Sequence, residues 1–135
     1  MDKLRLAALE AVLKLYADAE RLRDSLPTLR WLTRSRDDIV ATARQVLPAL
    51  QAAVLGLAHA DTIECRSQIG SGSLPVDLLP SAGIAVRPAG TGRRSGRQVE
   101  QLAAAFRRLP VPVIGRIQDG ALVFDLRMLD DPQAL

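Results

Sequence analysis

The stretch VIGRIQDGALVFDLR, residues 113–127, decides the fold of this chain because it predicts a β-hairpin. Apolar and polar residues flank the pair Asp119-Gly120, which suits the left-handed positions of a two-residue type I′ turn. We therefore predict strands over residues 113–118 and 121–127. The hairpin therefore predicts an antiparallel sheet, and the earlier segments of the chain are expected to supply its other strands.

Two segments before the hairpin show the period-two pattern of half-buried strands. In residues 61–67, Ile63 and Cys65 fall on one face, opposite polar neighbours. Nothing near Cys65 in the sequence favours its thiolate, so we predict a small core residue and not a nucleophile. The apolar positions of the second segment are Ala82, Ile84 and Val86. A helix ending at Pro110 follows, with apolar residues Val99, Leu102, Ala103 and Phe106.

The first third of the chain is helical by its apolar spacing. Residues 4–23 predict an amphipathic helix that Pro27 interrupts, and Leu29, Trp31 and Leu32 form a short apolar cluster after it. Ser35 stands three residues before Asp38, as in a capping box, and predicts the start of a second helix. The apolar face of that helix is Ile39, Ala43, Val46 and Leu50. Pro48 is expected to bend it or to end its last turn early.

Together these segments predict an α+β fold, an antiparallel sheet of about four strands covered by helices. The 135 residues suit a single domain over 1–135, with a helical lead-in at 1–55 and a strand-strand-helix-hairpin unit at 60–129.

The composition narrows the classes of function. Hydrophobic residues are 48% and charged residues 24%, as in an ordinary folded domain. A net charge of +3 permits a nucleic-acid partner, whereas 3% aromatics are too few for a base-stacking surface. One cysteine and one histidine exclude an internal disulfide and leave no zinc site. Without a signal sequence or an apolar window of about 20 residues, a cytoplasmic protein is predicted.

Two polar stretches offer candidate contacts with anions. The run SQIGSGS, residues 67–73, has glycines that free backbone N–H groups for a phosphate, but it equally fits a tight connection between strands. Arg93, Arg94 and Arg97 could meet a phosphate backbone, with a solvated surface as the alternative. Arg116 and Arg127 lie in the hairpin strands and either pair with a carboxylate such as Asp125 or face a ligand.

Three stretches, in order along nearly the whole chain, resemble the bacterial selenocysteine synthase family, the L-seryl-tRNA(Sec) selenium transferases. The first is DKLRLAALEAVLKLY at residues 2–16, continued by LPTLRWLTRS at 26–35. The others are SQIGSGSLPVDLLPS at 67–81 and LPVPVIGRIQDGALVFDLRML at 109–129.

The resemblance implies the small C-terminal domain of a fold type I enzyme that uses pyridoxal phosphate. In the family, seryl-tRNA(Sec) becomes selenocysteinyl-tRNA(Sec) with selenophosphate as the selenium donor, in a large homo-oligomer. Lys3 matches the family's Asp-Lys pair and Lys14 matches no catalytic position, so neither is expected to bind the cofactor. The catalytic domain and the N-terminal tRNA-binding region are expected to lie outside this chain, which alone should be inactive.

The resemblance also implies that residues 67–75 lie near the substrate. Gln68, Ser71 and Ser73 are therefore predicted to face the substrate cleft, with Arg116 as a further candidate, while Arg93, Arg94 and Arg97 are candidate tRNA phosphate contacts. The alternative is a free-standing, non-catalytic module for oligomerisation or for binding tRNA or a protein. An upstream in-frame cofactor domain in the gene would distinguish the two.

Overall fold

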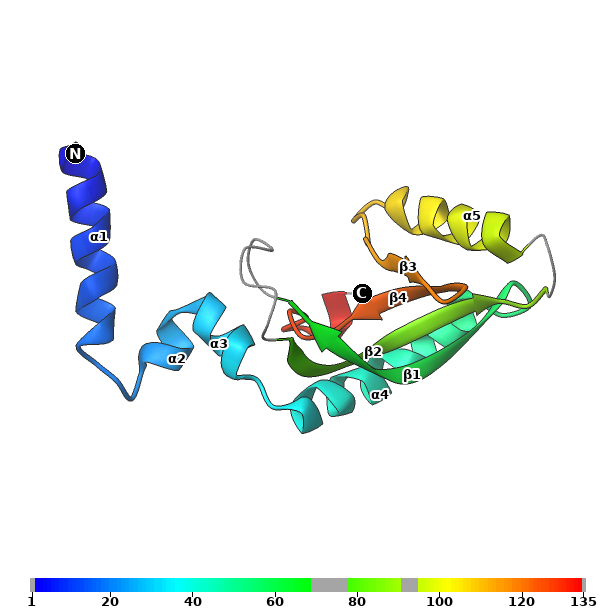
Figure 1. Ribbon diagram of the computed structural model, residues 1–135, viewed down its shortest axis with the longest axis horizontal. Helices are drawn as coiled ribbons and strands as arrows, with labels where there is room; N and C mark the ends of the chain where they lie inside the picture. The colour runs from blue at the N-terminus through cyan, green and yellow to red at the C-terminus, as the bar shows by residue number, and fades with distance from the viewer. Residues whose placement is uncertain (1, 69–77, 91–94, 135) are drawn as a thin grey trace. The chain divides into compact units, whose positions relative to one another are not determined.

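The computed structural model describes residues 2–68, 78–90 and 95–134. The chain divides into two compact units, Met1–Arg34 and Ser35–Leu135. The second unit contains a four-stranded antiparallel sheet with helices, which confirms the predicted α+β class (Figure 1). The division falls inside the predicted helical lead-in, and a single domain over 1–135 stays a prediction.

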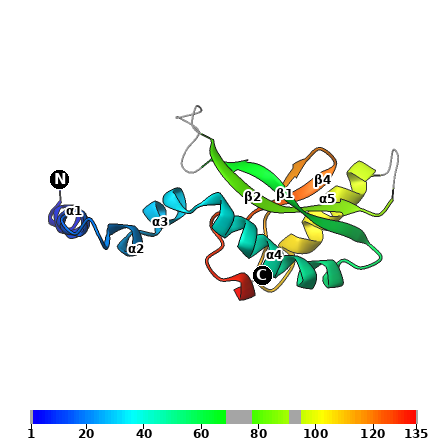
Figure 2. The same ribbon diagram turned by 90° about the horizontal axis from the view of Figure 1, so that it is seen from below.

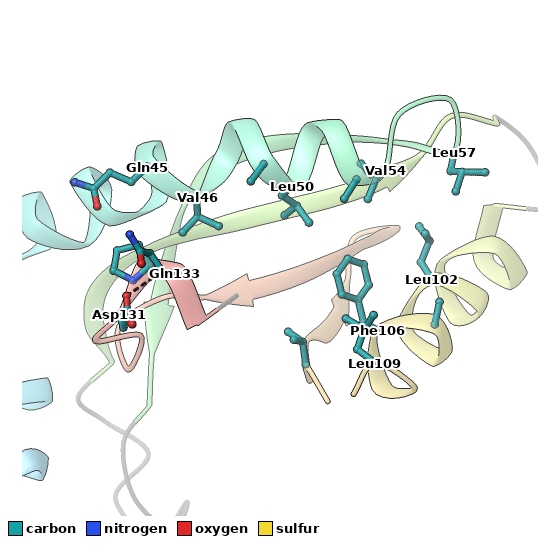
Figure 3. A pocket seen from close by; sticks show the side chains of 15 residues that line it. Gln45, Val46, Leu50, Val54, Leu57, Leu102, Phe106, Leu109, Asp131 and Gln133 are labelled. Atoms are coloured by element: carbon teal, nitrogen blue, oxygen red, sulfur yellow. Dashed lines mark hydrogen bonds between the residues drawn. The ribbon is translucent and has the colours of Figure 1, made fainter. Parts of the chain in front are cut away.

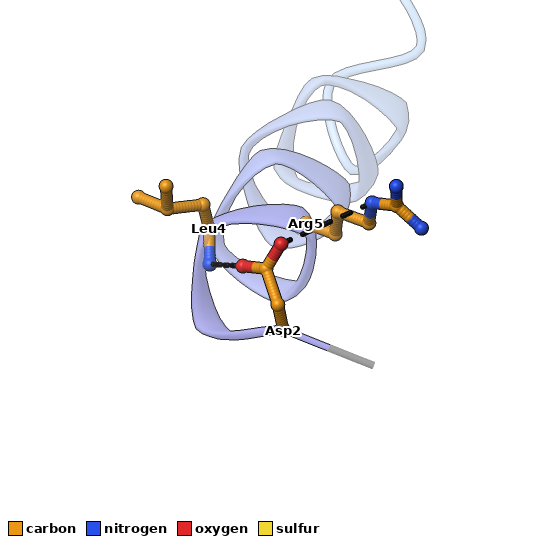
Figure 4. Close-up of polar contacts among 3 residues, drawn as sticks. All are labelled: Asp2, Leu4 and Arg5. Atoms are coloured by element: carbon orange, nitrogen blue, oxygen red, sulfur yellow. Dashed lines mark hydrogen bonds and ion pairs between the residues drawn. The ribbon is translucent and has the colours of Figure 1, made fainter.

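The first unit consists of helices α1 (Lys3–Tyr16), α2 (Leu22–Ser25) and α3 (Pro27–Thr33). Asp2 caps α1: one carboxylate oxygen accepts a 2.6 Å hydrogen bond from the backbone N–H of Leu4, and the other lies 4.0 Å from Arg5 Nε (Figure 4). The predicted continuous helix over 4–23 is wrong, because α1 ends at Tyr16. Asp18 instead accepts a 3.2 Å hydrogen bond from the backbone N–H of Arg21 and forms a turn.

The apolar side chains of α1 remain exposed, and none of its described residues is buried. Leu4 is 81% exposed and Leu6 47%. An amphipathic helix is stabilised in proteins mainly by packing of its apolar face. The apolar face of α1 is therefore available for packing against another surface.

Helix α4 (Arg36–Ala53) begins where the sequence predicts, because the Ser35 side chain accepts a 3.1 Å hydrogen bond from the backbone N–H of Asp38. Its predicted apolar face is buried. The expected early end at Pro48 is wrong, since the helix continues to Ala53. Proline removes one donor to the carbonyl of Arg44, and both residues are exposed, so water can satisfy that carbonyl.

The sheet has the strand order β1-β2-β4-β3 and is antiparallel throughout. Its strands are β1 (Ala58–Ser67), β2 (Leu79–Pro88), β3 (Arg116–Gln118) and β4 (Ala121–Asp125). The type I′ turn between β3 and β4 is confirmed by positive φ angles of 49° at Asp119 and 70° at Gly120. Residues 69–77, between β1 and β2, lie outside the described residues.

Helices α4 and α5 (Ser95–Arg107) cover one face of the sheet (Figure 2). The core between them includes Ile39, Val46, Ile84, Val86, Val99, Leu122 and Phe124. At the edge of the sheet, Gln51 of α4 donates a 2.9 Å hydrogen bond to the carbonyl of Ala60 in β1. No helix in the described part of the chain has the length and apolar character that a membrane crossing needs.

On the opposite face of the sheet, the core cluster of the described residues includes no helix residue of this unit. A small cluster of Ala85, Ala121 and Val123, with Ile63 against it, forms the apolar part of this face. We call this side of the sheet, opposite to α4 and α5, the open face. Because residues alternate between faces along a strand, the register also places Cys65, Ser81, Asp125, Arg87 and Arg116 on it.

Candidate functional site

The described part of the second unit contains two large hollows. The larger, about 900 Å³, is a groove between α4 and α5 (Figure 3). Its walls are mainly apolar and include Val46, Leu50, Val54, Leu102, Phe106 and Leu109. The polar groups at one end include Asp131, which accepts a 2.8 Å hydrogen bond from the backbone N–H of Gln133. The groove therefore offers an apolar surface but few groups for chemistry.

The second hollow is a depression of about 700 Å³ on the open face. Its polar lining comes from three strands, from the residue after β1 and from the β3–β4 turn: Glu64, Cys65, Arg66, Gln68, Arg87, Arg116, Gln118 and Asp119. Small apolar residues, Ala121 and Val123 among them, form part of its wall. This depression combines arginines, amides and a thiol, and we treat it as the candidate site.

The Asp125 carboxylate organises one end of the open face. One of its oxygens accepts hydrogen bonds from Ser81 Oγ at 2.7 Å and from the backbone N–H of Arg127 at 3.1 Å. The other accepts a hydrogen bond from Ser67 Oγ. Arg127 is buried and its guanidinium donates to the carbonyl of Pro80. These bonds, which we call the Asp125 network, tie the end of β1 and the start of β2 to β4.

Cys65 is one of the residues that line the depression, and it faces Ser81 of this network across the β1–β2 pairing. Burial raises the pKa of its thiol, and the Asp125 carboxylate raises it further, against smaller opposing effects of hydrogen bonds from Ser81 and Arg116 and of the Arg116 charge. The prediction that Cys65 is a core residue is wrong, because the side chain is half-buried and belongs to neither core cluster of the described residues. Cys65 stays a thiol at neutral pH, which agrees with the prediction that it is not a nucleophile.

The structure brings two of the predicted cleft residues together. Gln68 follows β1 and Arg116 begins β3, and both are exposed and line the depression. Arg116 Nε donates a 3.1 Å hydrogen bond to Gln118 Oε1. The charge of Arg116 is one of the smaller effects that lower the pKa of the Cys65 thiol, although Arg116 belongs to the far edge strand.

The remaining predicted residues lie elsewhere. Arg97 is exposed near the start of α5 and does not line the depression. The predicted site residues outside the described ranges are Ser71, Ser73, Arg93 and Arg94. The roles of all these residues stay predictions.

The sequence did not reveal that Arg87 contributes to the depression or that Asp125 joins two serines. The period-two pattern predicts only which face a residue occupies. The register, Cys65 opposite Ser81 and Gly83 opposite Asp125, decides which side chains meet. Within the described residues, no group of three or more His, Cys, Asp and Glu side chains is arranged to hold a metal ion.

Comparison with known proteins identifies the family. Residues 1–130 match the family model described as L-seryl-tRNA selenium transferase. The chain is 50% identical over 131 residues to the L-seryl-tRNA(Sec) selenium transferase of Methylocella silvestris, which covers 97% of this chain and 27% of that protein. It is 54% identical over 133 residues to the enzyme of the same name from Escherichia coli O45:K1, covering 98% of this chain and 28% of that protein.

The chain thus spans little more than a quarter of the length of the curated relatives it matches. The family match nevertheless covers nearly all of its residues, including both strands that frame residues 69–77 and the hairpin that carries Asp125. The chain therefore belongs to the L-seryl-tRNA selenium transferase family.

Proposed function

We propose that this chain forms one wall of the substrate cleft in a longer L-seryl-tRNA(Sec) selenium transferase, and that other parts of that polypeptide carry out the chemical step. The Asp125 network is the observation that supports the proposal. It bonds Ser67 and Ser81, the first and last residues of the family-typical stretch 67–81, to one carboxylate. These buried hydrogen bonds hold Ser67 and Ser81 themselves in place, as a substrate-positioning wall requires.

The reaction proposed for the longer enzyme follows from the family. Seryl-tRNA(Sec) would be converted to selenocysteinyl-tRNA(Sec), with selenophosphate as the selenium donor. The proposed partners of this chain are the other domains of the same enzyme and further copies in a homo-oligomer, in the cytoplasm. Pyridoxal phosphate, when bound to the longer enzyme, supplies the electron sink for the chemistry at the serine carbon atoms.

The lysines of this chain do not fit a pyridoxal phosphate site. Such a site needs an amine with a lowered pKa in a shielded pocket. Lys14 Nζ instead lies 2.7 Å from Glu10 Oε1, and its side chain is 74% exposed. Lys3 is exposed on the same helix, which buries none of its described residues. We therefore assign no step of the reaction to either lysine.

Pyridoxal phosphate added to the purified chain is expected to give no stoichiometric absorbance band of a lysine-bound cofactor near the visible edge, because neither amine is shielded. Absorbance titration measures this directly. The Lys3→Ala/Lys14→Ala variant is the control for weak reaction of surface amines. A saturable one-to-one band that this variant abolishes would contradict the proposal.

Gln68→Ala, made in the longer enzyme, is expected to lower the rate of selenium transfer by about tenfold through loss of a positioning hydrogen bond. Ser71→Ala is expected to act in the same direction. Gln68 is exposed, so the free energy of unfolding should change by less than about 0.5 kcal/mol. The measurements are the rate of selenocysteinyl-tRNA formation and the urea unfolding midpoint.

Gln101→Ala is the matched control, because Gln101 is an exposed glutamine of α5 outside the depression. It should leave the transfer rate unchanged. Wild-type rates in both Gln68→Ala and Ser71→Ala would end the assignment of residues 67–75 to the cleft. Family membership would be untouched by that result.

A further inference from the structure

We propose that the depression on the open face is a binding site for a phosphate group, held between Arg87 and Arg116. The two arginines come from different strands, β2 and β3, and β4 lies between them. Ala85 in β2, Val123 in β4 and Arg116 in β3 form one row across the sheet, and Arg87 lies two residues beyond Ala85 on the same face. Both arginines line the same hollow.

The floor between the two arginines is small and apolar. Ala85, Ala121 and Val123 are at most 5% exposed and form a separate cluster from the main core. Short side chains of this kind end close to the strands, whereas the exposed arginines on either side extend beyond them. The sheet thus provides a shallow basin with guanidinium groups on its walls.

The positive charge of these arginines is not neutralised within the described part of the chain. Neither Arg87 nor Arg116 has a carboxylate within ion-pair distance there. Glu64, on the rim, is paired with Arg36, and Asp119 accepts a 3.3 Å hydrogen bond from the Gln118 amide.

Two further carboxylates on the open face do not neutralise the arginines either. The Asp125 carboxylate accepts bonds from the two serines and from the Arg127 backbone. Asp61 lies on the same face of β1 but does not line the depression. Asp119 is thus the acid of the lining that no ion pair within the described residues neutralises, and it does not pair with either arginine. Arg116 bonds Gln118 through Nε, which leaves its terminal N–H groups and the Arg87 guanidinium for an anion.

The chemistry of the lining favours a phosphate oxyanion. Arginine presents a planar fork of donors that matches two phosphate oxygens, and such charge-assisted bonds are the stronger ones in proteins. Gln68 and Gln118 add neutral amide donors to the same lining. The hollow of about 700 Å³ exceeds a single phosphate, so both a free phosphate and a phosphodiester of a nucleic-acid backbone can enter. The proposal does not depend on the proposed reaction, because binding is measurable without turnover.

The test uses two probes on the purified chain at constant ionic strength. Inorganic phosphate at millimolar concentrations is followed through the arginine Nε–H signals in NMR spectra, and a short fluorescein-labelled single-stranded RNA is followed by fluorescence anisotropy. Arg87→Gln/Arg116→Gln is expected to weaken binding by about tenfold or more. RNA binding without phosphate binding would identify a phosphodiester, and the reverse would identify a free phosphate.

The matched control is Arg107→Gln/Arg108→Gln, which removes the same charge from two exposed arginines away from the depression. It should weaken binding by less than about twofold, as expected for a purely long-range effect. Arg116→Lys keeps the charge but removes the fork, and should give an intermediate affinity with an unchanged unfolding midpoint. Equal weakening by the two double variants, or binding of neither probe by the wild-type chain, would overturn the proposal. Loss of the family reaction would leave it standing.

Discussion

Asp125→Ala is expected to lower the free energy of unfolding of the chain by about 3 kcal/mol. The substitution removes the acceptor of Ser67 Oγ, Ser81 Oγ and the Arg127 backbone N–H together. Both serines and Arg127 are buried, so water cannot replace the carboxylate without opening the sheet. Urea unfolding followed by circular dichroism measures the loss.

Two controls separate the hydrogen bonds from the charge. Asp125→Asn keeps a carbonyl oxygen and should cost about 1 kcal/mol, because one acceptor of the network survives. Asp61→Ala removes an exposed carboxylate from the same face of β1 and should change stability by less than about 0.5 kcal/mol. If Asp125→Ala were as stable as Asp61→Ala, the network would have no role in holding the strand ends.

Gly83→Ala is expected to destabilise the sheet by about 3 kcal/mol or to prevent folding. A Cβ at this position of β2 would overlap the carbonyl oxygen of Phe124 and lie 3.1 Å from its carbonyl carbon and 3.3 Å from the Cα of Asp125. All three are backbone atoms of the paired strand β4, so none of them can move aside without breaking the β2–β4 ladder.

Gly96→Ala provides the matched comparison. A Cβ at Gly96 would meet no atom of the described residues within 4 Å, and the residue lies in the first turn of α5. Alanine has the higher helix propensity, so this variant should be as stable as the wild type or gain up to about 1 kcal/mol. Thermal unfolding of the two variants compares them directly. Equal stability of Gly83→Ala and the wild type would mean that β2 and β4 do not approach as closely as described.

The parts of the fold that the sequence predicts are those set by local chemistry. The Asp119-Gly120 turn needs two left-handed residues, and the Ser35 cap needs only its own first turn, so both are visible without tertiary information. The end of α1 was missed because the apolar spacing continues past Tyr16, whereas an Asp18 turn competes with the helix.

The candidate site was only partly predictable for a different reason. Gln68 was selected through the family resemblance and Arg116 first through its place in a hairpin strand, and both line one depression in the structure. Arg87 gives no signal in the sequence, since an arginine near the end of a strand is ordinary. Its relation to Arg116 depends on the pairing of β2 with β4 and of β4 with β3, over nearly thirty residues of chain. Asp125 likewise acquires its partners only through the register.

The order β1-β2-β4-β3 leaves the ten-residue strand β1 at the border of the sheet. A long border strand is a template on which another chain can add by main-chain pairing, the first step of fibril growth. Here the Gln51 side chain already donates a hydrogen bond to the Ala60 carbonyl of this edge strand. Asp61, Glu64 and Arg66 add charged side chains along the same strand. The same strand that borders the open face is thereby expected to resist unwanted self-addition.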